Sequence, residues 1–161
     1  MISSLVVNSS PVICLSKAGL AFLLPKAASS LYIPEGVIEE VKEGSESDPG
    51  RICITENGED FRVSISKVDQ DIQTWLLGRG ESEVLQWAKT YSCVALVDDY
   101  QARKCAVSLG IQAIGTLGFI LKCKSIGLIQ KVKPAVRDLM KSGLYVDQLV
   151  VRKILELAQE S

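Results

Sequence analysis

The chain has 161 residues, of which 47% are hydrophobic but only 6% aromatic, and its formal net charge is −1. This length suits one domain with a substantial aliphatic core, so we treat residues 1–161 as a single domain. The balance of 18 basic and 19 acidic residues gives no overall nucleic-acid signature, and a polyanion would need a local basic patch. No uncharged apolar run reaches the roughly 18 residues of a membrane span, and the amino terminus lacks a basic segment of the secretory kind. We therefore expect a cytoplasmic protein with no membrane partner.

The chain contains five cysteines and no histidine. No two cysteines form a C-x-x-C pair, so we expect buried thiols in a reducing compartment rather than disulfides or structural zinc. The absence of histidine excludes Ser-His and Cys-His nucleophilic catalysis and H-E-x-x-H zinc chemistry within this chain. Catalysis would have to use carboxylates, lysine, hydroxyls or a cofactor.

The first predicted element is a buried strand over residues 5–7, because its apolar run is continuous, as in parallel sheets. Asn8 follows this strand. The residues Ser9-Ser10-Pro11 then start a helix, with a serine as its N-cap and the proline in its first turn, and Pro25 is expected to end it. In open α/β sheets ligands bind at the carboxyl ends of strands, so Asn8 is the first candidate site residue.

A second strand is predicted over residues 30–33, followed by a short helix over 35–41. Residues 51–66 are predicted to form a β-hairpin, because two strand-like runs flank Asn57-Gly58, a step that supplies the positive φ values of a tight turn. We expect this hairpin to be an insertion or an edge element. Alternatively, one of its arms belongs to the main sheet.

The second half of the chain alternates helices with strands. Helices are predicted over residues 69–77, 81–88, 100–109, 117–125, 133–141 and 147–159, and strands over residues 94–97 and 111–114. Strands separated by helices predict a parallel sheet with right-handed crossovers, and hence an α/β fold.

Polar and mostly acidic residues lie at or near the ends of these strands. They are Asn8, Glu39, Glu40, Glu81, Glu83, Asp98, Asp99 and Thr116. Right-handed crossovers bring the carboxyl ends of the strands to one edge of the sheet. Carboxylates crowded there repel one another unless a cation lies between them. All-oxygen ligation suits Mg²⁺ or Mn²⁺, and such sites most often serve phosphoryl or phosphodiester chemistry.

Each acid also has a purely structural explanation. Asp98-Asp99 could cap the following helix, Glu81 and Glu83 could complement a helix dipole, and Glu39-Glu40 could be solvated. Their joint position at one sheet edge favours the metal site. A set of basic residues could contact phosphates or simply be solvated: Arg79, Arg103, Lys104, Lys122 and Lys124.

Five short motifs, in this order, resemble those of the PIN-domain family. They are the run from Val6 to Ile13, Pro34 with Val37 and Glu40, Gly80-Glu81-Ser82-Glu83, Val97-Asp98-Asp99 with Ala102-Arg103, and Gly115-Thr116-Leu117-Gly118. The chain is most similar to a VapC-like prokaryotic branch with GExE, DDxxAR and GTLG motifs, over residues 5–158. The resemblance implies a three-layer α/β/α fold and a Mg²⁺- or Mn²⁺-dependent ribonuclease acting on single-stranded RNA. Many members are toxins paired with a small antitoxin protein, and many are homodimers.

The resemblance also implies roles for individual residues. The catalytic residues would be Asn8, Glu40, Glu81 and Asp99, the metal ligands would be Asn8, Glu40, Glu81, Glu83, Asp98 and Asp99, and the substrate-binding residues would be Ser10, Arg103 and Thr116. Glu81 is preferred to Glu83 because it shares a helix face with the apolar Leu85 and Ala88, which would place it toward the sheet.

Asn8 departs from the family pattern, because most PIN nucleases have Asp at this position. An amide oxygen still ligates a hard cation, but one negative charge is lost. The alternative is therefore a catalytically weakened or inactive PIN-fold module that binds RNA or protein. A flavodoxin-like receiver is a third hypothesis, although residues 8–10 lack the acidic pair that it needs and no suitable lysine follows the fourth strand.

Overall fold

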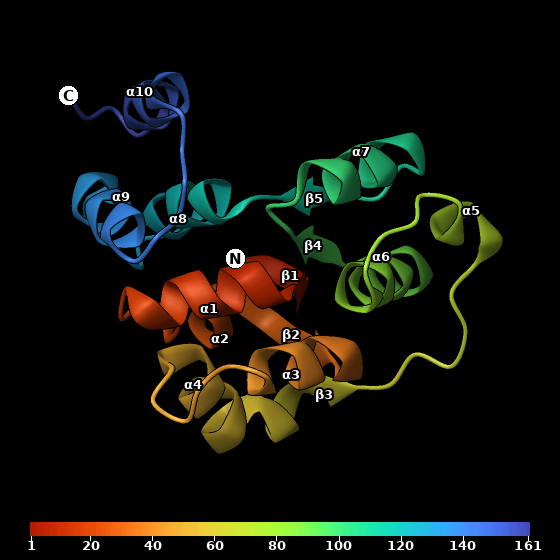
Figure 1. Cartoon of the computed structure of the whole chain (residues 1–161). Helices are drawn as coiled ribbons and strands as arrows, with labels where there is room; N and C mark the ends of the chain where they lie inside the picture. The colour runs from red at the N-terminus through yellow and green to blue at the C-terminus, as the bar shows by residue number, and fades with distance from the viewer.

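A five-stranded parallel sheet with strand order β3-β2-β1-β4-β5 forms the centre of the molecule (Figure 1). The structure is a computed structural model and describes all 161 residues. The strands are β1 (Ile2–Val7), β2 (Ala28–Pro34), β3 (Arg62–Val63), β4 (Val94–Leu96) and β5 (Ala113–Ile114). Helices flank the sheet on both faces, which confirms the predicted three-layer α/β/α fold.

Ten α-helices and one 3₁₀ helix surround the sheet. They are α1 (Ser9–Lys17), α2 (Leu23–Ala27), α3 (Glu35–Lys42), α4 (Pro49–Asn57), the 3₁₀ helix η1 (Gly58–Phe61), α5 (Gln70–Gln73), α6 (Arg79–Tyr91), α7 (Tyr100–Ser108), α8 (Thr116–Ser125), α9 (Val132–Lys141) and α10 (Gln148–Leu157). Helix α6 packs across β1, β2 and β4, whereas α1 packs against α4, α3 and α9. Helices α9 and α10 lie at the opposite end of the molecule from α5 (Figure 1). None of the helices is long and apolar enough to cross a membrane.

Strand β1 lies at the centre of the hydrophobic core. Leu5, Val6 and Val7 are all completely buried, because β2 and β4 pair with the two edges of β1 and helices cover its faces. This explains the continuous apolar run in the sequence, since both faces of such a strand need apolar side chains. The buried hydrophobic residues of the chain form one cluster of 38.

The order of the strands reverses between β1 and β4. From β1 the sheet grows through β2 to β3, and the chain then returns to add β4 and β5 on the other side. Asn8 follows β1 directly, and its backbone N–H donates to the carbonyl of Leu96 in β4 at 3.1 Å. Asp98 lies two residues beyond the end of β4. Both residues therefore lie at the topological switch point, where open α/β sheets bind their ligands.

The predicted β-hairpin over residues 51–66 is wrong. Its first arm lies within α4, and Asp48 caps this helix by accepting the backbone N–H groups of Gly50 and Arg51 at 2.9 and 3.2 Å. Asp48 followed by Pro49 is a helix-start signal, but the β-branched residues after it resemble a strand. The second arm contains β3, which pairs in parallel with β2. This matches the alternative in which one arm belongs to the main sheet.

Some predicted helix ends are also wrong. The first helix ends at Lys17, and the chain then turns at Gly19, which has a φ of 72°. Pro25 lies instead in the first turn of α2, where its missing N–H removes no intrahelical bond. The N-cap position of α1 is held by Asn8 rather than by a serine, although the Asn8 side chain makes no capping hydrogen bond. Helix α5 is much shorter than the predicted 69–77.

Candidate active site

Asp98 is held in place by the start of α8. Its Oδ1 accepts the backbone N–H of Thr116 at 2.7 Å, and its Oδ2 accepts the Thr116 hydroxyl at 2.6 Å. Thr116 is completely buried and is the first residue of α8. Unpaired N–H groups at a helix start favour a negative charge. The structure therefore fixes the orientation of the Asp98 carboxylate without any cation.

Glu40 connects α3 to α1 and α6. Its Oε2 accepts the hydroxyl of Ser9 at 2.6 Å, and its Oε1 accepts the backbone N–H of Gly80 at 2.9 Å. Ser9 is the neighbour of Asn8 in the chain, and Gly80 is the neighbour of Glu81. The carboxylate of Glu40 thus joins the start of α1 to the start of α6 near the switch point.

Glu83 is buried between α6 and α3. It is only 5% exposed, and its Oε1 accepts the backbone N–H of Gly36 at 3.0 Å. Its Oε2 accepts Nε of Arg79 at 2.6 Å, and the Arg79 guanidinium also pairs with Glu39. The hydrogen bond and charge of Glu83 raise the pKa of Arg79 above its ordinary value. A basic side chain therefore occupies one carboxylate oxygen of Glu83.

The sequence pattern placed Glu81 toward the sheet in preference to Glu83, but of the two acids Glu83 is the more deeply buried. Glu81 is half-buried, whereas Glu83 is almost completely buried. The prediction considered only the face toward the sheet. Helix α6 also packs against α3, so its buried surface is wider than one stripe and includes the Glu83 position.

Asp99 caps the helix that follows it. Its Oδ2 accepts the backbone N–H of Ala102 at 2.9 Å, at the start of α7, and Asp99 is exposed. The two adjacent acids thus bind different helices, Asp98 the start of α8 and Asp99 the start of α7. This is the capping role that the sequence allowed for this pair.

Asn8 has a buried oxygen without a partner. The residue is 3% exposed, and its Oδ1 accepts no hydrogen bond. Leaving a buried acceptor unpaired costs about 1–3 kcal/mol. The unpaired oxygen is therefore free to accept a hydrogen bond from an ordered water or to ligate a cation.

Three glycines allow the carboxylates to approach the backbone. A Cβ on Gly80 would lie 2.7 and 2.8 Å from the oxygens of Glu40, and one on Gly36 would lie 2.8 Å from Oε2 of Glu83. A Cβ on Gly115 would lie 3.1 Å from Oδ1 of Asp98 and 3.2 Å from the guanidinium of Arg103. Gly80 and Gly115 belong to the GExE and GTLG motifs, so each motif supplies a backbone position that a carboxylate can approach closely.

Ser10, Cys14 and Arg103 lie around this group of acids. Burial raises the pKa of the Cys14 thiol, a hydrogen bond with Ser10 opposes this rise, and the charge of Asp98 adds to it. Cys14 therefore remains a neutral thiol at neutral pH. Ser10 and Arg103 are exposed, and Arg103 and Asp98 both lie close to Gly115 without forming an ion pair. Neither Cys14 nor Gly36 could be recognised from the sequence as a neighbour of the site, because their positions depend on how the helices pack.

Of the two alternatives for the five basic residues, one phosphate-contacting patch or separate surface charges, the structure favours the second. Arg79 is paired with acids, and Lys122 and Lys124 lie in the last turn of α8, at the end opposite Thr116. Lys124 binds Glu160 at 2.8 Å. Arg103 and Lys104 lie in α7, near the strand ends.

The available donors suit a hard cation, but they do not form a compact metal cage. No group of three or more Asp, Glu, His or Cys side chains converges closely enough to hold a metal ion. The oxygens near the switch point are nevertheless those that Mg²⁺ and Mn²⁺ prefer, and Oδ1 of Asn8 accepts no hydrogen bond from the chain. By donor type, the residues present therefore fit such an ion.

Comparison with known proteins assigns the chain to a family. A search of curated proteins found none that matches it. A protein-family model described as a PIN domain matches residues 4–160, which is nearly the whole chain. This match agrees with the parallel sheet and with the polar residues at its switch point. The nuclease-type fold is therefore established at the family level: the chain belongs to the PIN-domain family.

Proposed function

We propose that the protein is a metal-dependent endoribonuclease that acts on single-stranded RNA with Mg²⁺ or Mn²⁺. The observation that carries this proposal is the buried, unpaired Oδ1 of Asn8 at the switch point. Asn8, Glu40 and Asp98 would hold the ion, with Glu81 or Glu83 as the ligand from α6. Asp99 remains a candidate ligand, although its carboxylate caps α7.

The side chains around the site support this chemistry. When bound, the metal would supply charge stabilisation and activation of water. Thr116 fixes the orientation of Asp98, and Ser9 with Gly80 fixes that of Glu40. Arg103 is exposed beside Asp98, where its guanidinium could bind an RNA phosphate, and Ser10 could add a hydroxyl.

A second candidate function is binding of RNA or protein without cleavage. Two observations favour it: no three acids converge on one point, and Arg79 already occupies an oxygen of Glu83. Asn8 also removes one of the negative charges that would attract a cation. In this case the fold would present RNA-contacting residues without activating water.

Cleavage of a fluorescent single-stranded RNA with Mg²⁺ or Mn²⁺ distinguishes the two candidates. We expect cleavage by the wild type, loss of cleavage in Asp98→Asn and Glu40→Gln, and a gain in Asn8→Asp. Calorimetric titration with Mn²⁺ should show the same order of affinities. Equal activity in the wild type and in both ligand variants would exclude the proposed site. RNA binding without cleavage, together with no Mn²⁺ binding at millimolar concentration, would support the second function.

The toxin role, the antitoxin and the homodimer are proposals that rest on the VapC-like motifs. A neighbouring gene for a small DNA-binding protein that co-purifies with this chain and suppresses its toxicity on expression would support the first two. Light scattering of the purified chain would test the homodimer.

A further inference from the structure

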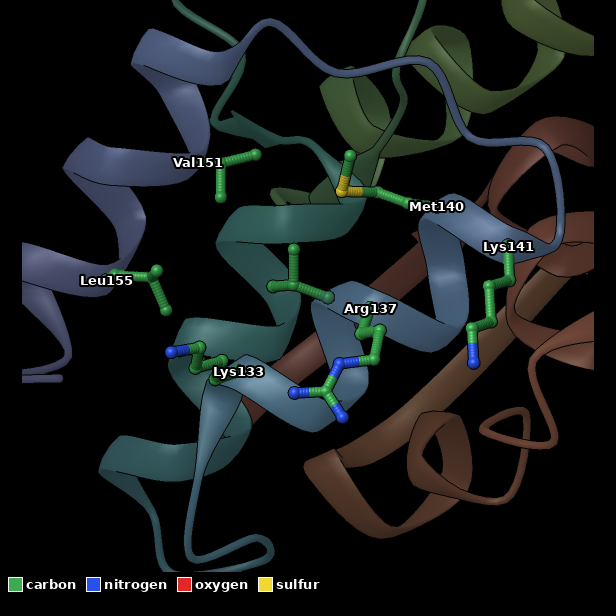
Figure 2. A pocket seen from close by; sticks show the side chains of 7 residues that line it. Lys133, Arg137, Met140, Lys141, Val151 and Leu155 are labelled. Atoms are coloured by element: carbon green, nitrogen blue, oxygen red, sulfur yellow. The ribbon is translucent and has the colours of Figure 1, made fainter. Parts of the chain in front are cut away.

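A groove lies between α9 and α10, beyond the end of α8 that is remote from Thr116 (Figures 1 and 2). We call it the α9–α10 groove. Its volume is about 430 Å³, and its lining residues are Lys133, Val136, Arg137, Met140, Lys141, Val151 and Leu155. None of them belongs to the site at the strand ends.

The two walls of the groove are apolar. Val136 and Met140 line it from α9, and Val151 and Leu155 line it from α10, on the side facing α9 (Figure 2). Met140 remains 40% exposed. Helix α10 buries little of its apolar surface, and three more of its apolar side chains are exposed: Leu149, Val150 and Leu157. A helix that leaves this many apolar side chains exposed is a candidate interaction element.

One edge of the groove is basic. Lys133, Arg137 and Lys141 are spaced four residues apart, so they form one stripe along α9 (Figure 2). No ion pair within the chain involves Arg137 or Lys141. Like charges at this spacing destabilise a helix. The stripe therefore does not stabilise α9 itself.

The basic character extends over the whole segment. Residues 131–153 contain six basic and only two acidic residues, in a chain whose formal net charge is −1. A local positive field of this kind favours a negatively charged partner over a neutral one.

We propose that the α9–α10 groove binds an amphipathic α-helix of another protein, with apolar side chains along one stripe and Asp or Glu beside it at four-residue spacing. The apolar stripe would pack between Met140 and Val151, and the acids would pair with Arg137 and Lys141. RNA fits this surface less well, because no aromatic side chain lines the groove for base stacking and its apolar walls offer nothing to phosphates. The proposal does not depend on the nuclease function.

A designed peptide tests the proposal directly. A helix of about 14 residues is about 21 Å long and would cover α9. The probe is a fluorescent synthetic peptide with Leu on one stripe and Glu beside it, and its binding is measured by fluorescence anisotropy. We expect saturable binding to the wild type and about tenfold weaker binding to Arg137→Glu/Lys141→Glu, because each reversal replaces an attraction with a repulsion. Met140→Gln/Val151→Thr should also weaken binding, since it makes both walls polar.

Two controls separate the groove from general charge effects. Lys26→Glu/Lys67→Glu changes the net charge equally at exposed lysines outside the groove and should bind like the wild type. A peptide with Lys in place of Glu should not bind. The proposal would be overturned if the acidic peptide failed to bind, or if the Lys peptide bound equally well. It would also be overturned if Lys26→Glu/Lys67→Glu lost as much affinity for the acidic peptide as Arg137→Glu/Lys141→Glu. Tighter binding of single-stranded oligouridylate that is lost in Arg137→Glu/Lys141→Glu would overturn it too, as would self-association of the chain that is lost in this variant.

Discussion

Glu40 of α3 and Glu83 of α6 each accept a hydrogen bond from the second residue of the other helix. Glu40 accepts the N–H of Gly80 at 2.9 Å, and Glu83 accepts the N–H of Gly36 at 3.0 Å. Each helix start thus receives a carboxylate from its neighbour, which both satisfies unpaired N–H groups and places a negative charge where the helix dipole favours it. The GExE motif and the acid of α3 therefore serve the packing of two helices as well as any chemistry.

Gly80→Ala should destabilise the protein despite the higher helix propensity of alanine. The new Cβ would lie 2.7 Å from a Glu40 oxygen and push the carboxylate away from the N–H group. The lost hydrogen bond to a charged group outweighs the gain in propensity, so we expect a decrease of about 1 kcal/mol in the free energy of unfolding. Gly118→Ala in α8 is the control, because its Cβ would meet only Ile114 at 3.8 Å and should stabilise the protein. Urea denaturation of both variants measures the difference, and equal changes would contradict the packing role of Glu40.

Arg79→Gln should increase the affinity for Mn²⁺ if Glu83 is a ligand. The substitution removes the guanidinium that competes with a cation for Glu83, so we expect about twofold to fivefold tighter binding in calorimetry. Arg62→Gln is the matched control, because Arg62 also pairs with two glutamates, Glu35 and Glu59, but outside the site. Unchanged affinity in both variants would indicate that Glu83 has only a structural role and that Glu81 is the acid of α6 to test next.

We expect the adjacent acids to have different roles, with Asp98 as a site residue and Asp99 only as the N-cap of α7. Asp99→Ala removes the N-cap of α7 and should lower the free energy of unfolding by about 1 kcal/mol, with little effect on Mn²⁺ affinity. Asp98→Asn keeps an acceptor for Thr116 but removes the charge, so it should weaken Mn²⁺ binding more than it affects stability. Calorimetry and thermal denaturation of both variants test this. The opposite pattern would make Asp99 the ligand.

Glu160 should make part of the stability dependent on acid pH. Hydrogen bonds from Lys124 and from the N–H groups of Val132 and Lys133 lower the pKa of Glu160 to about 2. In the unfolded chain the pKa of a glutamate side chain is about 4.3. The contribution of Glu160 is therefore complete above about pH 4.3 and is lost as the pH falls from there toward about 2.

The measurement is urea denaturation at pH 6 and pH 3. Glu160→Gln should be clearly less stable than the wild type at pH 6, and this difference should shrink at pH 3. Glu46→Gln, at an exposed position outside these contacts, should match the wild type at both values. A difference between wild type and Glu160→Gln that does not change with pH would show that the charge of Glu160 is not responsible.

The sequence predicted the strands well where their burial is two-sided. The apolar runs Leu5–Val7 and Ala95–Val97, in and directly after β1 and β4, are continuous because neighbouring strands and helices cover these residues completely. Helix α4 was missed because Ile52 and Ile54 resemble a strand locally, whereas the capping contacts of Asp48 decide the outcome. Residues that follow strands, such as Asn8 and Asp98, could be placed from the pattern alone.

The contacts of the acids could not be predicted in the same way. The bond between Gly36 and Glu83 joins residues 47 positions apart, and it depends on how α3 packs against α6. The same packing places Glu83 inside and Glu81 at its margin. Periodicity describes one helix at a time, so it carries no information about which neighbour covers a second side of that helix.

Four helix starts each receive one carboxylate: Asp98 at α8, Asp99 at α7, Glu40 at α6 and Glu83 at α3. The backbone therefore balances much of the negative charge before any ion arrives. In a zinc finger the chain remains unfolded without its metal, whereas here the carboxylates already have partners within the chain, so a cation bound under the proposed function would not be needed for folding. A chelator should then leave the folded state intact and act only on ligand binding.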